Sequence, residues 1–363
     1  MTVAAAITAL AMISGACGSS SKSPDASSGS SGAGSTATTG SAPLAAATMN
    51  ESGSTFQLPY LQEVAKGFKS AQSAVTINVS GGGSGKGRQD LADQIVDFAA
   101  ADGLPAAADL PKFKGGGLLY FPTVAAPITV SYNLSGVDKL KLDADAIAKI
   151  FQLQIKTWDD PAIKALNPDA KLPSKNITVA HRSDSSGTTQ NFTGYLKMAA
   201  PATWTLDTGS TVTWPADTQG GNGNAGVAQI IKSADGGIGY VDYSDAKALG
   251  LKFADIKNKS GSFVTPSLDG TSVALQSVAV NPDLSYNPLN ADGATAYPIA
   301  TPTWIIAYKT QTDHAKGMAL KAFLDYIYGP GQATAATVDY AKLSSTILDK
   351  AKAQLDQLVI PNA

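Results

Sequence analysis

The stretch Ile177-Thr-Val-Ala-His-Arg-Ser-Asp-Ser-Ser-Gly-Thr188 predicts a β-strand that ends in a polar loop. Ile177 and Val179 alternate with smaller or polar residues, as in a partly buried strand. The segment after the loop carries apolar residues at the three- and four-residue spacing of one helix face: Phe192, Tyr195 and Leu196. This stretch therefore indicates a strand, a loop and a helix in direct succession.

A second unit of the same kind precedes it. Val75, Ile77 and Val79 alternate as a strand, the glycine-rich loop Ser80–Gly87 follows, and Leu91 and Ile95 are predicted on the next helix. Strands that alternate with helices favour an α/β fold with parallel sheets and crossover connections. Further elements are expected as a helix starting near Phe56, a strand at 126–134, a helix capped by Asp143 and ending at Phe151, a helix opened by 157–161, a strand at 303–309 and a helix at 314–328.

Composition limits the possible functions. The chain has 363 residues, of which 44% are hydrophobic, and single cores stop growing near about 250–300 residues, so we expect two lobes. The 27 Lys and Arg residues are balanced by 29 Asp and Glu residues and form no basic run, which argues against nucleic-acid binding. With a single cysteine and only two histidines, no metal site is expected.

The N-terminus differs in kind from the rest. Residues 3–16 form an apolar run that is too short to cross a membrane, and Cys17 follows Ser-Gly-Ala as in the lipobox of bacterial lipoproteins. We expect residues 1–17 to be a lipoprotein signal peptide ending at a lipidated Cys17, and the alternative is a plain secretion signal with an incidental cysteine. Residues 18–48 are almost entirely Ser, Gly, Ala, Thr and Pro, which predicts a disordered tether.

Three loop-to-helix junctions carry hydroxyls and glycines: Ser54-Thr55-Phe56, Gly83-Ser84-Gly85 and Ser186-Gly187-Thr188. The first turn of a helix has unpaired N–H groups and a partial positive charge, so each junction is suited to an anion. Arg182 adds a planar fork of donors that matches a tetrahedral oxyanion. A single junction of this type would be read as an ordinary helix cap. On the motifs alone, ordinary caps and an oxyanion site that includes Arg182 therefore both stay open.

Several motifs resemble, in this order, the bacterial phosphate-binding protein of the high-affinity phosphate ABC importer, a family of periplasmic or lipoprotein solute-binding proteins. The similarity extends from about Glu51 to the C-terminus and is weakest at 258–290, and the Arg-Ser-Asp-x-Ser-Gly-Thr element is its most specific part. The motifs are Glu51-Ser-Gly-Ser-Thr-Phe56, Gly83-Ser-Gly85, 96–102, Phe121-Pro-Thr123, Lys156–Ile163, Leu166-Asn-Pro168, His181–Thr188, Gly236-Gly-Ile-Gly-Tyr240 and Tyr297-Pro-Ile299.

The resemblance implies a type II, two-lobed periplasmic-binding-protein fold in which each lobe is a mostly parallel sheet flanked by helices. Lobe I would comprise 49–124 and 298–363, and lobe II would comprise 125–297, joined by a two-strand hinge. Such a protein captures inorganic phosphate between its lobes and delivers it to the membrane permease of an ABC importer. The implied protein is a monomer without a cofactor, located outside the cytoplasm and lipid-anchored to the outer face of the cell membrane, or periplasmic.

The family's ligand contacts, carried over by position, fall on residues of both lobes. Asp184 would orient Arg182 rather than contact the ligand. The sequence departs from the family at Ala101, where Ser is frequent, and at Ser185, where a Gly is replaced. The implied phosphate-binding residues are Thr55, Phe56, Ser84, Asp102, Arg182, Ser186, Gly187 and Thr188.

Asp102 carries the specificity argument. A carboxylate repels a bound anion unless the ligand brings a proton that the carboxylate can accept. Phosphate carries such a proton at neutral pH, whereas sulfate does not. An acceptor left facing an acceptor costs about 1–3 kcal/mol or more, so Asp102 would exclude sulfate. Arsenate resembles phosphate in protonation and size and stays open as a weaker ligand.

Two other functional classes are alternatives to a transport protein. A secreted phosphatase or serine hydrolase would use Ser84 or Ser186, but the sequence has no Gly-x-Ser-x-Gly element and few histidines to act as a base. A surface adhesin or phosphate sensor on the same fold is a further alternative, favoured by the long tether. We expect the protein to bind its ligand without catalysing a reaction.

Overall fold

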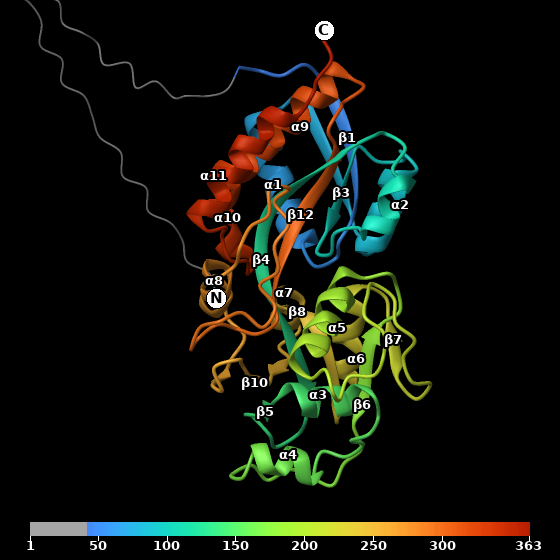
Figure 1. Cartoon of the computed structure of the whole chain (residues 1–363), viewed down its shortest axis with the longest axis vertical. Coiled ribbons are helices and arrows are strands. Elements are labelled where there is room, and N and C mark those ends of the chain that lie inside the picture. The colour runs from blue at the N-terminus through green and yellow to red at the C-terminus, as the bar shows by residue number, and fades with distance from the viewer. Residues whose placement is uncertain (1–41) are drawn as a thin grey trace, which may run out of the picture. The chain divides into compact units, whose positions relative to one another are not determined.

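Alternating strands and helices organise residues 42–363, the part of the chain that this computed structural model describes (Figure 1). These residues form one compact unit. The predicted signal peptide, Cys17 and residues 18–41 of the predicted tether lie outside the described residues. The first strand, β1, begins at Ala47, within two residues of the predicted end of the tether.

Lobe I is built on parallel strands. Its sheet runs in the order β2-β1-β3-β12, with the first three strands parallel and β12 antiparallel to β3. The strands are β1 (Ala47–Gly53), β2 (Val75–Ser80), β3 (Phe98–Ala101) and β12 (Ala300–Tyr308). The helices are α1 (Leu58–Ala71), α2 (Ser84–Ala92), α9 (His314–Tyr326), α10 (Gln332–Thr334) and α11 (Ser345–Gln354), with 3₁₀ turns at Ala107–Lys112, Ala335–Val338 and Leu355–Gln357.

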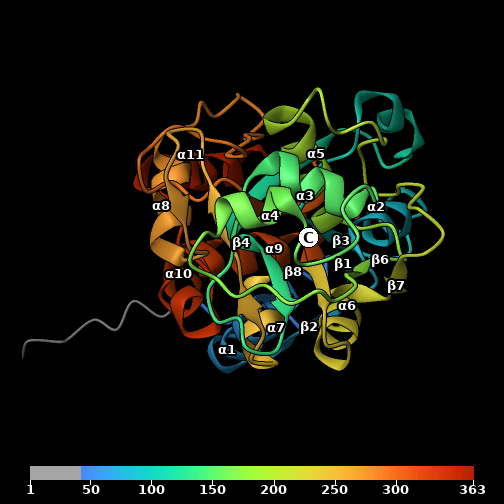
Figure 2. The ribbon, with the colours of Figure 1, turned by 90° about the horizontal axis from the view of Figure 1, so that it is seen from below.

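Lobe II continues the same sheet in the order β4-β8-β6-β7, and its strands β8, β6 and β7 are parallel. Its strands are β4 (Leu118–Asn133), β6 (Thr178–Arg182), β7 (Gln219–Gly221), β8 (Gly237–Asp242) and β9 (Lys252–Phe253), with a small second sheet of β5 (Lys141–Leu142), β10 (Asp255–Lys257) and β11 (Phe263–Val264). Its helices are α3 (Ala144–Phe151), α4 (Pro161–Leu166), α5 (Gly187–Ala199), α6 (Gly223–Ser233), α7 (Tyr243–Ala248) and α8 (Leu268–Gln276). Figure 2 shows helices of both lobes around the central strands. The predicted α/β, two-lobed fold is confirmed.

Two long strands join the lobes. Strand β4 pairs with β12 from Leu118 to Pro127 and then with β8 from Ile128 to Asn133. The pairing of β4 with β12 shifts register between Pro302 and Trp304. Proline gives no N–H to a ladder, so such positions interrupt regular pairing. The sequence predicted only the second half of β4, because Pro122 breaks the strand pattern in the first half.

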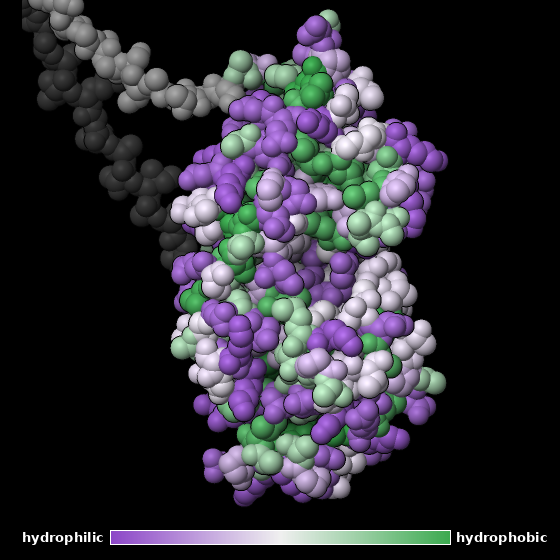
Figure 3. Space-filling model, in the orientation of Figure 1, coloured by the Kyte–Doolittle hydropathy of each residue, from purple (hydrophilic) through white to green (hydrophobic). Residues whose placement is uncertain are grey.

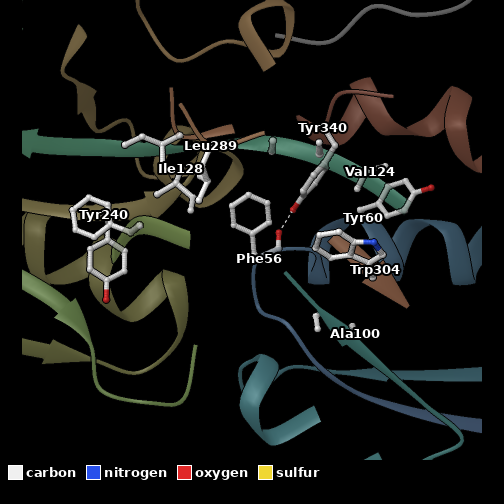
Figure 4. Packing of buried hydrophobic residues seen from close by; sticks show 14 of the residues in the cluster. Phe56, Tyr60, Ala100, Val124, Ile128, Tyr240, Leu289, Trp304 and Tyr340 are labelled. Atoms are coloured by element: carbon white, nitrogen blue, oxygen red, sulfur yellow. Dashed lines mark hydrogen bonds between the residues drawn. The ribbon is translucent and has the colours of Figure 1, made fainter. Parts of the chain in front are cut away.

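The apolar core runs through both lobes. Phe56, Tyr60 and Tyr340 are fully buried, and the Tyr340 hydroxyl donates to the Phe56 carbonyl oxygen at 2.5 Å (Figure 4). Tyr240 of β8 belongs to the same cluster of buried residues. On the face in Figure 3, hydrophilic and hydrophobic residues are intermixed. The core thus holds the Thr55–Phe56 turn firmly at the lobe boundary.

The ends of the helices agree with the sequence prediction at some positions and differ at others. Asp143 caps α3 as predicted, since its carboxylate accepts from the Ala146 N–H at 2.9 Å. The prediction that Ile95 lies on a helix face was wrong: α2 ends at Ala92 and Ile95 is 66% exposed. The predicted helix 314–328 ends at Tyr326 and continues as the π-type turn Ile327–Gly331, which contains Pro330.

Candidate functional site

The first two junctions lie where lobe I meets lobe II. Thr55 lies in the turn before α1, and Ser84 is the first residue of α2, preceded by Gly83 at a φ of 91°. The Ser54 hydroxyl accepts from the Phe56 N–H at 3.0 Å and the Gln57 N–H at 3.2 Å. In this structure the Phe56 N–H therefore bonds within its own turn.

Asp102 follows the end of β3 and is only 1% exposed. Its Oδ1 accepts from the Ser84 hydroxyl at 2.8 Å, and its own N–H donates to Ser84 Oγ at 3.2 Å. Its Oδ2 accepts from the Thr188 hydroxyl at 3.3 Å. Because Ser84 belongs to lobe I and Thr188 to lobe II, the Asp102 carboxylate bridges the lobes.

Arg182 ends β6 and is 3% exposed. Its Nε donates to Asp184 Oδ1 at 2.7 Å and its Nη2 to Oδ2 at 2.5 Å, which is a bidentate pair. Its Nη1 donates to Thr188 Oγ1 at 3.3 Å. Burial alone would raise the pKa of Asp184, but the hydrogen bonds and charge of Arg182 outweigh burial and lower that pKa. Asp184 therefore stays ionised.

Gly187 permits the close approach of the lobes. A Cβ at this position would lie 2.5 Å from Ser84 Oγ and 2.6 Å from Asp102 Oδ2, closer than real Cβ atoms come. The Gly85 N–H also donates to the Ser185 carbonyl at 2.9 Å across the same boundary. Ser186, by contrast, is engaged locally, since its hydroxyl caps α5 by accepting from the Thr189 N–H at 3.2 Å.

One residue of this region was missed by the sequence analysis. Asn224, near the start of α6, donates from Nδ2 to Thr55 Oγ1 and to Thr188 Oγ1, each at 3.2 Å. A signal was present, because Gly220-Gly-Asn-Gly-Asn224 joins β7 to α6 and repeats the glycine-rich, strand-to-helix pattern of the other junctions.

These contacts define a single hydrogen-bonded group, which we call the interlobe cluster. It combines one guanidinium, two carboxylates, an amide and three hydroxyls from both lobes, which are the types of group that a small protonated oxyanion can hydrogen-bond. Its members are Thr55, Ser84, Asp102, Arg182, Asp184, Gly187, Thr188 and Asn224.

The cluster lacks the arrangement of a serine nucleophile and its base. His181 stacks on Trp214 with ring centroids 5.0 Å apart, and its Nδ1 lies 2.9 Å from the Arg182 carbonyl. Burial lowers the pKa of His181. Among residues 42–363 there is no group of three His, Cys, Asp or Glu side chains that could hold a metal ion.

Comparison with known proteins agrees with this geometry. Residues 30–330 match the model of the PBP superfamily domain. The phosphate-binding protein PstS of Pasteurella multocida is 33% identical over 314 residues, covering 85% of this chain and 90% of the relative. PstS 3 of Mycobacterium tuberculosis is 33% identical over 298 residues, covering 78% and 80%. The fold and site thus define a solute-binding protein of the PBP superfamily.

Within this superfamily, the chain belongs to the phosphate-binding protein family PstS. A solved structure of similar fold has a TM-score of 0.71, is 21% identical and covers 85% of this chain and 94% of its own. It is described as a high-affinity periplasmic phosphate-binding protein bound with phosphate. No helix within residues 42–363 has the length and apolar character of a membrane span.

Proposed function

We propose that this protein binds inorganic phosphate in the interlobe cluster and supplies it to an ABC-type phosphate importer. The carrying observation is that Asp102, Arg182 and Thr188 form one hydrogen-bonded group although they come from different lobes. An anion bound there would touch donors from both sides. Family membership supports the same ligand, because the relatives are phosphate-binding proteins.

Each ligand contact has a distinct role in this proposal. Arg182 provides charge and donors, while Asp184 fixes the orientation of its guanidinium. Ser84 and Thr188 provide hydroxyl donors, and Asp102 accepts the proton that phosphate carries. The donors expected from the sequence at the Phe56 N–H, the Ser186 hydroxyl and the Gly187 N–H complete the proposed set. For the Phe56 N–H and the Ser84 and Thr188 hydroxyls, donation to a ligand would compete with the bonds described above. The Ser186 hydroxyl only accepts in its local bond, so its O–H could still donate.

Binding and release would use movement of the two lobes about β4 and β12. We assign 49–124 and 298–363 to lobe I and 125–297 to lobe II. Pairing on β4 changes from β12 to β8 between Pro127 and Ile128, so the boundary between lobes falls on a strand rather than in a loop. Hinge closure then completes the contacts and presents one closed shape to a permease.

The proposal places the protein outside the cytoplasm. Residues 1–17 would direct export, a lipid on Cys17 would anchor the chain to the outer face of the membrane, and residues 18–48 would serve as the tether. The folded part would act as a monomer, because both halves of the site come from one chain. Its role is binding rather than catalysis.

Isothermal titration calorimetry of the full chain tests this function. We expect one phosphate to bind per chain and no heat from sulfate under the same conditions. Arg182→Ala should abolish the signal, whereas Lys197→Ala, at an exposed position of α5, should leave it unchanged. Equal heats for sulfate and phosphate would contradict the proposed function.

A further inference from the structure

Asn224 belongs to the interlobe cluster, but the proposed set of ligand contacts does not use it. It is fully buried, and both its backbone and its side chain reach Thr55 of the opposite lobe. The Asn224 N–H donates to Thr55 Oγ1 at 3.3 Å, and Nδ2 donates to the same oxygen at 3.2 Å. The Nδ2 group also donates to Thr188 Oγ1 at 3.2 Å. One amide group therefore joins the hydroxyls of two lobes.

The neighbours of Thr188 fix the direction of these bonds. A hydroxyl has one O–H to donate and two lone pairs to accept. The Thr188 O–H donates to the Asp102 carboxylate, and one lone pair accepts from Arg182, which is always protonated. The remaining lone pair can only accept, so Asn224 must present its NH₂ group to Thr188.

This orientation of the Asn224 amide destabilises the fold, which suggests that it is kept for a role in the site. With Nδ2 turned to the two hydroxyls, Asn224 Oδ1 is buried without a partner among the described residues. An unsatisfied buried acceptor is destabilising. Thr55 Oγ1 likewise accepts twice from Asn224, which leaves its O–H as a donor. Both hydroxyls are thereby restricted to donating.

We propose that Asn224 is a positioning residue that restricts Thr55 and Thr188 to donating, so that on ligand binding the Thr188 O–H, which donates to Asp102 in this structure, can turn to the anion. This inference rests on the proposed phosphate site. Hydroxyls whose lone pairs are occupied cannot accept a proton from the ligand, so ligand protons are left to Asp102. Asn224 would therefore tune the site against the more protonated form of phosphate, in addition to linking the lobes.

The test compares Asn224→Ala with wild type in the full chain, by phosphate calorimetry at about pH 6 and about pH 8, which favour the more and the less protonated ligand. At the higher pH we expect affinity to fall about tenfold, the effect of losing roughly one hydrogen bond to the bound state. At the lower pH the loss should shrink, because the freed lone pairs can accept the extra ligand proton. Asn222→Ala, exposed at the helix start and without a side-chain cap bond, is the matched control and should bind as wild type.

A double-mutant cycle provides a second readout. If Asn224 acts through Thr188, then Asn224→Ala should cost less in a Thr188→Val background than in wild type. The charged groups that also interact in this region are Asp102, Arg182 and Asp184, with Arg88 near Asp102 and Asp245 near Arg182, and they are unchanged in every comparison.

Two outcomes would overturn the inference. The first is unchanged affinity in Asn224→Ala, and the second is an equal loss at both pH values with additive effects in the cycle, as a purely structural residue would give. Both outcomes can be observed only if the wild-type protein binds phosphate. Failure of wild type to bind would instead contradict the proposed function.

Discussion

Two buried carboxyl groups in lobe I differ in what surrounds them. Glu51 on β1 is 3% exposed and Asp102 after β3 is 1% exposed. Glu51 pairs with Phe98 at the start of β3, whereas Asp102 follows the last residue of that strand. Asp102 accepts from hydroxyls of both lobes, whereas Glu51 Oε2 accepts only from the Ser80 N–H at 3.0 Å and its Oε1 has no partner among the described residues.

A buried carboxyl group is therefore not necessarily part of a binding site. Burial of Glu51 raises its pKa to about 8, so this side chain is neutral at physiological pH. Both oxygens of Asp102, by contrast, accept from hydroxyls, one in each lobe. Partners from both lobes, not low exposure, identify the site.

Of the variants that compare these two carboxyl groups and the contact between the lobes, Asp102→Ala should lower phosphate affinity most. Asp102→Ala leaves the proton of bound phosphate without an acceptor and leaves Ser84 and Thr188 without a shared partner. A hydrogen bond to a charged group contributes about 1.5–3 kcal/mol, so phosphate affinity should fall about 10- to 100-fold. Calorimetry measures the change. Glu51→Gln should bind phosphate as wild type, and an equal loss in both variants would erase the distinction between the two carboxyls.

A smaller loss of phosphate affinity is expected when a substitution disturbs the contact between the lobes but removes no polar group. Gly187→Ala would place a Cβ 2.6 Å from Asp102 Oδ2, so the lobes could not meet as they do here. We expect about tenfold weaker phosphate binding, the loss of roughly one hydrogen bond. The matched control on α5 is Gly194→Ala, whose Cβ would approach only Leu289 Cδ1, at 3.4 Å. Equal affinities of the two variants would contradict the close-approach argument.

The smallest effect on binding, but a clear one on stability, is expected at Glu51. Its pKa is about 8 in the folded protein and 4.5 for an ordinary glutamate, so between these values the folded state holds a proton that the unfolded state has lost. Stability conferred by neutral Glu51 should therefore fall as pH rises through this window, by at most about 1.4 kcal/mol per pH unit, and level off above it.

Urea denaturation of wild type and Glu51→Gln at about pH 5 and about pH 8 measures this contribution. The variant should lose less stability than wild type between the two conditions. Glu63→Gln, at an exposed position of α1, should follow wild type. A wild type that gains stability from Glu51 as pH rises would show that this carboxyl is ionised in the fold.

Local sequence signals were enough for the fold class and for several element boundaries. The strand–loop–helix units around Ser84 and Ser186 were predicted because alternation and helical spacing are local properties. Strand β1 was missed since Ala47-Thr-Met-Asn follows a low-complexity run, and the first half of β4 was missed at Pro122. These strands are defined by pairing with distant segments, which a local pattern does not contain.

Only part of the candidate site could be predicted from the sequence. Arg182, Asp184 and Thr188 lie within seven residues of one another, so a motif could contain them. Asn224 is linked to Thr55 across 169 positions of the chain, and its role depends on the fold bringing α6 to the turn before α1. The sequence likewise gave no indication that Glu51 would be buried without a second partner.

We propose above that Asp102 accepts a hydrogen bond from protonated phosphate and thereby excludes sulfate. The most direct measurement is the ratio of phosphate to sulfate affinity in wild type and in Asp102→Asn, determined by calorimetry on the full chain at one pH. Asparagine offers an N–H donor where the carboxylate offers only acceptors, so we expect sulfate to bind the variant and the preference for phosphate to drop sharply. A variant that rejects sulfate as firmly as wild type would show that discrimination comes from elsewhere in the molecule.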